Sequence, residues 1–97
     1  MDDTIRMEII AGQALQEDII NELLLMHAME YYTLIPEVLG VGYSGEKRGD
    51  AVWPEKNFIL IVYCGEKEAL QAKQAIDKIR KRFPEEGVRF FTSPKLA

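Results

Sequence analysis

The sequence offers few side chains that could carry out catalysis. It has a single histidine, His27, and a single cysteine, Cys64, with no cluster at metal-ligand spacing. His27 lies near the end of a predicted helix, where a cationic ring would suit the helix dipole. Cys64 ends an apolar segment, which is typical of packing rather than of a nucleophile. We find no nucleophile beside a general base, so we predict that the chain is not an enzyme and assign no catalytic residue or metal ligand.

The segment richest in binding chemistry spans residues 40–57 and reads GVGYSGEKRGDAVWPEKN. Gly40 and Gly42 lack side chains, so their amides could lie close to a ligand, or the backbone could bulge there. Lys47 and Arg48 could receive a phosphate or a carboxylate. Long loops in compact domains are usually functional or disordered, so two interpretations stay open: a ligand loop, or a long hairpin pinned by its tryptophan.

Composition limits the classes of protein to which the chain can belong. Its 97 residues fit one domain, 1–97, and 47% are hydrophobic, which is high for a small chain and indicates apolar surface buried in an oligomer. The net charge of −4 argues against nucleic acid as a partner. One cysteine rules out an internal disulfide, and residues 1–12 lack the apolar core of a secretory signal, so we expect a cytoplasmic location. No apolar run approaches the roughly 20 residues that span a bilayer, so we predict no membrane insertion.

Hydrophobic periodicity predicts six elements in the order β-α-β-β-α-β. The strands are expected at 4–10, 30–42, 57–64 and 88–93, and the helices at 14–28 and 66–83. With right-handed crossovers this order predicts an α+β fold, the ferredoxin-like sandwich, in which two helices cover one face of a four-stranded antiparallel sheet. The basic side of the second helix is interrupted by acids, which favours a solvated face over a nucleic-acid stripe.

Two strands carry further information about the sheet. Pro36 cannot donate a hydrogen bond to a strand ladder, so the second strand should be an edge strand or bulged at that point. The strand at 57–64 is apolar on both faces, with Phe58, Leu60 and Val62 on one and Ile59, Ile61 and Tyr63 on the other. A strand buried on both faces needs cover on both, so we expect the sheet faces without helices to pack together between chains.

Residues 37–42, EVLGVG, resemble the E-V-x-G-x-G that ends the second strand of the PII signal-transduction (nitrogen regulatory) family, just before its T-loop. Trp53 and Pro54 stand where that loop returns with a Leu-Pro-like pair, and 48–57 is similar to a divergent PII-like subgroup with short loops. The resemblance implies a homotrimer whose sheets face the threefold axis. It also implies effectors bound in clefts between subunits at the loop base, with the loop docking on a transporter, enzyme or regulator.

The chain departs from the family pattern at several positions. Typical members bind ATP or ADP together with 2-oxoglutarate, and use a basic residue and a glutamine where this chain has Tyr43 and Ser44. Glu55 and Val88 stand at positions where the family has lysines. We therefore do not carry over 2-oxoglutarate sensing. We expect ATP or ADP to bind more weakly than in typical members, and the small ligand is either an adenine nucleotide or another small anion.

These observations predict a regulatory protein that signals through the loop at 43–56. The predicted ligand-binding residues are Gly40, Val41, Gly42, Lys47, Arg48 and Arg89, and the predicted partner-binding residues are Tyr43 and Trp53. The alternative is a metal-linked accessory protein of a related trimeric ferredoxin-like class, acting beside an efflux or transport system. One histidine and one cysteine provide few soft ligands, so that alternative would need carboxylates or residues from two chains.

Overall fold

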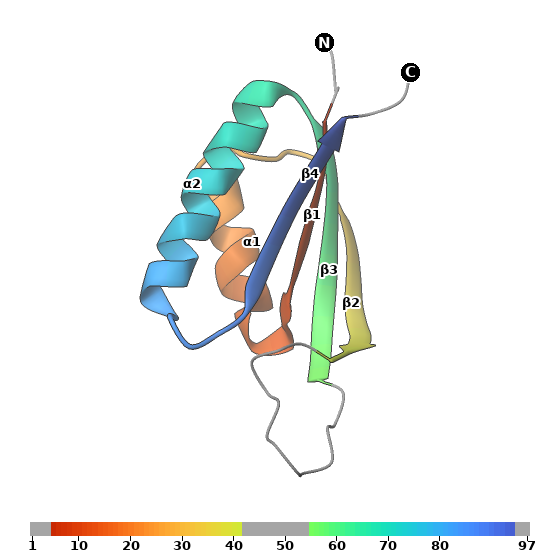
Figure 1. The fold of residues 1–97 in the computed structure, drawn as a ribbon. Coiled ribbons are helices and arrows are strands. Elements are labelled where there is room, and N and C mark those ends of the chain that lie inside the picture. Colours follow the sequence, from red (N-terminus) through yellow and green to blue (C-terminus); the bar gives the residue numbers. More distant parts are fainter. Residues whose placement is uncertain (1–4, 42–54, 95–97) are drawn as a thin grey trace.

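The computed structural model describes residues 5–41 and 55–94 of the chain. Two helices lie on one face of a four-stranded antiparallel sheet with the strand order β2-β3-β1-β4 (Figure 1). In chain order the elements are β1 (Ile5–Gly12), the 3₁₀ turn η1 (Gln13–Leu15), α1 (Gln16–Leu25), β2 (Thr33–Gly40), β3 (Glu55–Cys64), α2 (Glu66–Arg82) and β4 (Val88–Pro94). The predicted ferredoxin-like sandwich is confirmed, and four of its six elements end within two residues of the predicted bounds.

Strand register assigns each side chain to one face of the sheet. Ile9 in the central strand β1 pairs with Leu60 of β3 and with Phe90 of β4. Because side chains alternate along a strand, these residues share the helix-covered face, whereas Ile10 and its partner Ile59 share the opposite face. The prediction that β3 presents apolar side chains on both faces of the sheet is therefore confirmed.

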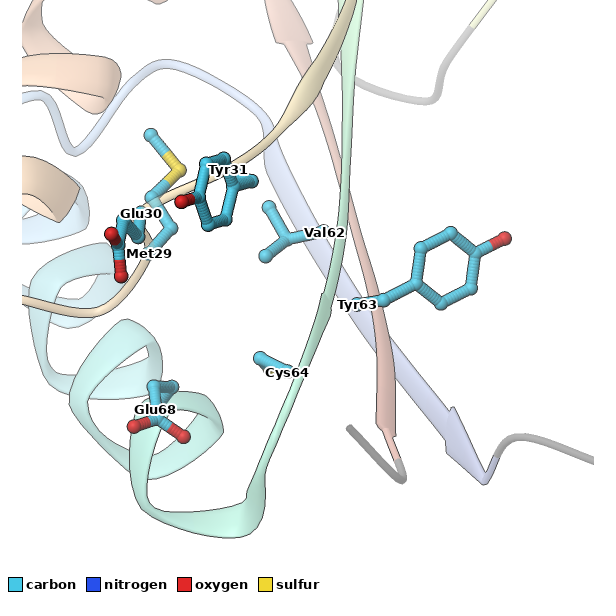
Figure 2. Close-up of a pocket in the computed structure, with 7 residues that line it drawn as sticks. All are labelled: Met29, Glu30, Tyr31, Val62, Tyr63, Cys64 and Glu68. Carbon is cyan, nitrogen blue, oxygen red and sulfur yellow. The ribbon is translucent and has the colours of Figure 1, made fainter. Parts of the chain in front are cut away.

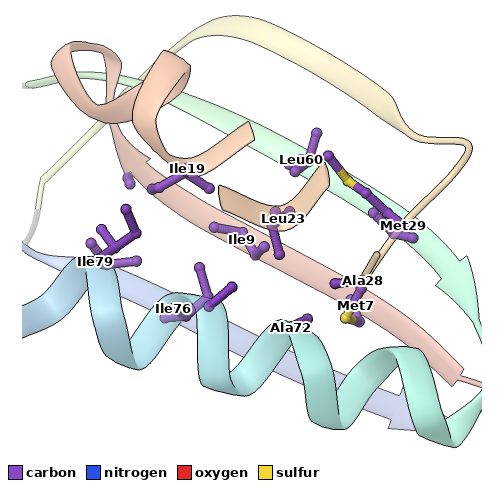
Figure 3. Packing of buried hydrophobic residues seen from close by; sticks show 14 of the residues in the cluster. Met7, Ile9, Ile19, Leu23, Ala28, Met29, Leu60, Ala72, Ile76 and Ile79 are labelled. Carbon is purple, nitrogen blue, oxygen red and sulfur yellow. The ribbon is translucent and has the colours of Figure 1, made fainter. Parts of the chain in front are cut away.

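A cluster of buried side chains fills the space between the sheet and the two helices (Figure 3). α1 contributes Ile19 and Leu23, which are fully buried. α2 presents a run of small residues together with two isoleucines, and the small residues let this helix lie close to the sheet. The buried residues of α2 are Ala69, Ala72, Ala75, Ile76 and Ile79. Phe83, just after the end of α2, is partly buried against the same cluster.

The predicted first helix, 14–28, was too long at both ends. The chain enters it through the 3₁₀ turn and leaves it at Leu25. Beyond that point His27 adopts a positive φ of 55°, and its N–H donates to the carbonyl of Leu24 at 3.1 Å. The N–H of Ala28 donates to the carbonyl of Leu23 at 2.9 Å. This pair of bonds is the Schellman arrangement, which ends a helix and turns the chain, here placing Ala28 and Met29 in the core.

The predicted second strand, 30–42, was also too long. β2 begins at Thr33, and its predicted end, Gly42, lies outside the described residues. The strand is at the sheet edge, and its register against β3 shifts between Ile35 and Val38, on either side of Pro36. Pro36 predicted either an edge position or a bulge, and the structure has both.

Candidate functional site

The predicted ligand site begins where β2 and β3 end their pairing, at Gly40 opposite Glu55. A Cβ added to Gly40 would lie 2.8 Å from Nδ2 of Asn57, which is closer than real Cβ atoms come to a neighbour. Asn57 is buried, and Nδ2 is the end of its side chain, so this amide would have to shift to make room for a Cβ. Glycine at position 40 therefore leaves room for the side chain of Asn57 in the same fold, while Val41 next to it is exposed.

A second contact near this loop base joins Gln13, after β1, to the bulge of β2. Gln13 of η1 donates from Nε2 to the backbone carbonyl of Pro36 at 2.7 Å, and the same atom lies 3.5 Å from Oε1 of Glu37. The bulge around Pro36 interrupts the ladder there, so the side chain of Gln13 supplies a partner to the Pro36 carbonyl at that point. Sequence reasoning missed both Gln13 and Asn57. The available signal was a polar amide beside an apolar strand: Gln13 directly follows the first strand, and Asn57 begins the apolar run of the third.

The structure does not bring all predicted ligand residues together within one chain. Arg89 is exposed in β4, where it pairs with Ile10 on the face without helices. Two strands separate β4 from β2, which puts Arg89 and Gly40 roughly 14 Å apart across the strands, and the register offsets them along the strands as well, so their separation is about 20 Å. The remaining predicted site residues lie outside the described part of the chain, namely Gly42, Tyr43, Lys47, Arg48 and Trp53.

The sheet face without helices, here called the open face, is apolar at its centre. Ile35 is 37% exposed and Phe91 is 50% exposed, and both lie in outer strands. The central part of the face carries Ile10, Ile59 and Ile61, which are only half-buried within this chain. Isolated exposed apolar residues are ordinary, but a contiguous group on one sheet face indicates a binding surface.

A polar cluster occupies the end of the open face away from the loop base. Arg6 donates to the hydroxyl of Tyr63 at 2.7 Å and to Oε2 of Glu8 at 2.9 Å. Its guanidinium carbon also lies 5.7 Å from the centroid of the Tyr63 ring. The hydrogen bonds to Glu8 and then Tyr63 raise the pKa of Arg6 above its usual value. The open face therefore has an apolar group at Ile10, Ile59 and Ile61 and a polar, hydrogen-bonded end, and Glu8 of this polar cluster lies between Ile61 and Phe91.

The basic side of α2 is engaged with acids and backbone. Lys78 lies 3.6 Å from Glu22, and Arg82 lies 3.4 Å from Asp18, so both cations link α2 to α1. Arg80 donates from Nε and one terminal nitrogen to the carbonyl of Val88, at 3.3 and 2.8 Å, which anchors the start of β4. These contacts fit the interpretation of a solvated helix face.

Residues 5–41 and 55–94 contain neither a metal-ligand cluster nor a membrane-spanning helix. No group of three or more His, Cys, Asp or Glu side chains in these ranges could hold a metal ion. No helix within them is long and apolar enough to cross a membrane.

Comparison with known proteins gives matches in structure only. No protein-family model matches the sequence, and no curated protein matches it. CPII, a nitrogen regulatory PII-like protein from Thiomonas intermedia K12 solved with ADP, AMP and bicarbonate, is similar with a TM-score of 0.72 and 16% identity, covering 95% of this chain and 89% of its own. The GlnK–ATP complex of B. subtilis is similar with a TM-score of 0.66 and 14% identity, covering 96% and 84%.

The chain has the fold of PII-like signalling proteins. The same fold also supports catalysis elsewhere. A phage SAM lyase in complex with S-methyl-5′-thioadenosine is similar with a TM-score of 0.62 and 14% identity, covering 97% of this chain and 83% of its own. The fold by itself therefore does not separate signalling from enzymatic function.

Proposed function

We propose that this chain is a non-enzymatic PII-like regulatory protein. It assembles as a homotrimer through the open face, binds a small anionic effector in clefts between subunits, and signals through residues 43–56. The observation that carries the proposal is the apolar open face, together with the fold that the chain shares with PII-like proteins. The effector is an adenine nucleotide or another small anion.

The open face supports assembly on energetic grounds. Removing apolar surface from water contributes roughly 25 cal/mol for each Å². Ile35, Ile59, Ile61 and Phe91 keep part of that surface exposed in the single chain, and a neighbouring copy would remove it from water. The hydrogen-bonded cluster around Arg6 supplies a polar border to the contact, as interfaces commonly have.

The separation of Gly40 from Arg89 supports a site shared between chains. Within one chain two strands lie between these residues, so a ligand as small as a nucleotide phosphate or bicarbonate could not contact both. A neighbouring copy could bring its own Arg89 to the loop base. In that arrangement the exposed guanidinium of Arg89 would donate charge-assisted hydrogen bonds to the anion. Tyr43 and Trp53 would then contact the partner, a transporter or a regulatory protein.

The proposal is tested by measuring mass and effector binding together. Sedimentation velocity at micromolar concentrations should give the mass of three chains. Calorimetry with ADP, alone and with bicarbonate, should show binding that Arg89→Gln weakens about tenfold, as expected for one charge-assisted contact worth about 1.5 kcal/mol. Lys67→Gln removes another exposed cation, on α2, and should leave the affinity unchanged. A monomer, or an affinity that is indifferent to Arg89, would contradict the proposal.

A further inference from the structure

A cavity of about 370 Å³ lies at the end of the molecule opposite the loop base. It is bounded by the connection between α1 and β2, by the last residues of β3 and by the first turn of α2 (Figure 2). The described residues that line it are Met29, Glu30, Tyr31, Val62, Tyr63, Cys64 and Glu68. Its volume falls in the range of natural small-molecule sites, which is roughly 300–1,000 Å³.

Two features of the fold shape this cavity. The Schellman turn after α1 places Met29 in the core and leads the chain across the end of the sheet. Val62 and Cys64 alternate onto the helix-covered face of β3 and point into the cavity, whereas the ring of Tyr63 points to the other side of the sheet (Figure 2). Tyr63 therefore lines the cavity through its backbone. The site lies on the helix side, so burial of the open face would not occupy it.

The side chains around the cavity favour a cation. The inner wall is apolar, because Val62 and Cys64 are both buried there. Glu30 and Glu68 place carboxylates at its border, and no Lys, Arg or His is present among its described lining residues. Oε1 of Glu68 accepts a hydrogen bond from the N–H of Gly65 at 3.2 Å, which holds that carboxylate in place.

An aromatic ring completes the lining. Tyr31 is 82% exposed and lies beside the cavity on the α1–β2 connection (Figure 2). The described residues leave most of this side chain exposed, and the face of a tyrosine ring attracts a cation within about 6 Å of its centroid. An apolar wall, two carboxylates and an exposed aromatic ring together form the chemistry that recognises an organic cation.

We propose that this cavity binds a small organic cation with an apolar body, such as a primary amine on an aromatic or alkyl group. The apolar body lies against Val62 and Met29. The ammonium group lies between Glu30 and Glu68, near the ring of Tyr31. This site is separate from the loop base and takes a ligand of the opposite charge, so the proposal does not depend on the regulatory function proposed above.

The test uses three probes of matched size and different charge. Amide chemical shifts of ¹⁵N-labelled protein are followed during titration with 2-phenylethylamine, 2-phenylethanol and 3-phenylpropionate. The amine should shift the amides of residues 29–31, 62–64 and 68, and should bind about tenfold more tightly than the alcohol because of its charge-assisted contacts. The carboxylate should bind more weakly than the alcohol.

Two variants and two matched controls localise the effect. Glu30→Gln should weaken amine binding about fivefold, and Tyr31→Ala about threefold, as expected for a partly exposed ion pair and a cation–π contact. Glu17→Gln and Tyr32→Ala change an exposed carboxylate and a neighbouring tyrosine that do not line the cavity, and each should leave the affinity within about twofold, as is usual for surface changes.

All four positions are exposed, so folding should be retained, and the dispersion of the amide spectrum verifies it. The proposal is overturned if the amine does not bind, if its shifts appear outside the cavity, if the three probes bind equally or the carboxylate binds best, or if the control variants weaken binding as much as Glu30→Gln and Tyr31→Ala do.

Discussion

The two faces of β3 carry similar side chains in very different surroundings. On the helix side, Phe58 and Leu60 are fully buried by the chain's own helices. On the open side, Ile59 and Ile61 are equally apolar but only half-buried, and Tyr63 is 51% exposed. The difference shows that apolar character alone does not identify the core of a monomer. It identifies surface that needs cover, and the source of that cover differs between the two faces.

The largest effect on stability is expected from a substitution on the helix-covered face of β3. Leu60→Ala should lower the free energy of unfolding by about 3–4 kcal/mol, because it leaves a cavity among side chains that cannot move together to fill it. Ile59→Ala should cost about 1 kcal/mol in the single chain, because its side chain is already partly in water. Urea denaturation measures both. If the open face is an interface, the loss in free energy of unfolding caused by Ile59→Ala should vary with protein concentration, whereas the loss caused by Leu60→Ala should not. Equal costs at every concentration would remove the distinction between the faces.

A charge on the open face should break assembly without breaking the fold. Ile61→Asp would place an unpaired carboxylate in an apolar contact, at a cost of at least about 2 kcal/mol for each subunit. Sedimentation velocity should then show one chain in place of three, with the helical circular dichroism retained. Leu70→Asp adds the same charge at an exposed position of α2 and should leave the mass unchanged. A trimer that tolerates Ile61→Asp would show that the open face is not the interface.

Two glycine-to-alanine substitutions compare a position where a Cβ would meet a neighbouring atom, Gly40, with one where it would meet none, Gly12. Gly40→Ala should destabilise the fold by about 1 kcal/mol, because its Cβ would come within 2.8 Å of Nδ2 of Asn57 and force that side chain to move. Gly12 has φ −62°, and a Cβ added there would meet no atom within 4 Å, so Gly12→Ala should stabilise the chain by about 0.4–1 kcal/mol. Thermal unfolding measures both variants. A reversed order would mean that Asn57 does not constrain Gly40.

The smallest effect concerns α2, whose outer side is open to water. Lys73 donates a hydrogen bond to Asp77 at 3.1 Å, and this contact, aided by Arg80, lowers the pKa of the Asp77 carboxyl. A lowered pKa in the folded state contributes stability above the unfolded pKa, and this contribution is lost as the pH falls through the folded pKa. Lys73→Met should raise the Asp77 pKa toward its usual value in a ¹³C NMR titration, while Lys67→Met should not. An unchanged pKa in Lys73→Met would show that the pair is not formed in solution.

Local pattern was sufficient to predict the elements and their order. A short continuous apolar run in 57–64 and helical spacing in 66–83 each identify an element, because a strand buried on both faces and a helix with one apolar side leave these different patterns in the sequence. Pro36 likewise predicted an edge position or a bulge, because its missing N–H is a property of the residue itself. The sequence by itself thus determined the sandwich and the two apolar faces of β3.

Only the tertiary structure decided where distant residues meet. The helix predicted to reach residue 28 ends at Leu25, because His27 takes a left-handed conformation that lets Ala28 and Met29 enter the core. Gly40 is constrained by Asn57 through strand pairing, and Gln13 reaches Pro36 across the end of the sheet. The distance between Gly40 and Arg89 likewise follows from strand order. Periodicity reports which face a residue takes, but contacts between elements depend on register and packing in three dimensions, which no local pattern encodes.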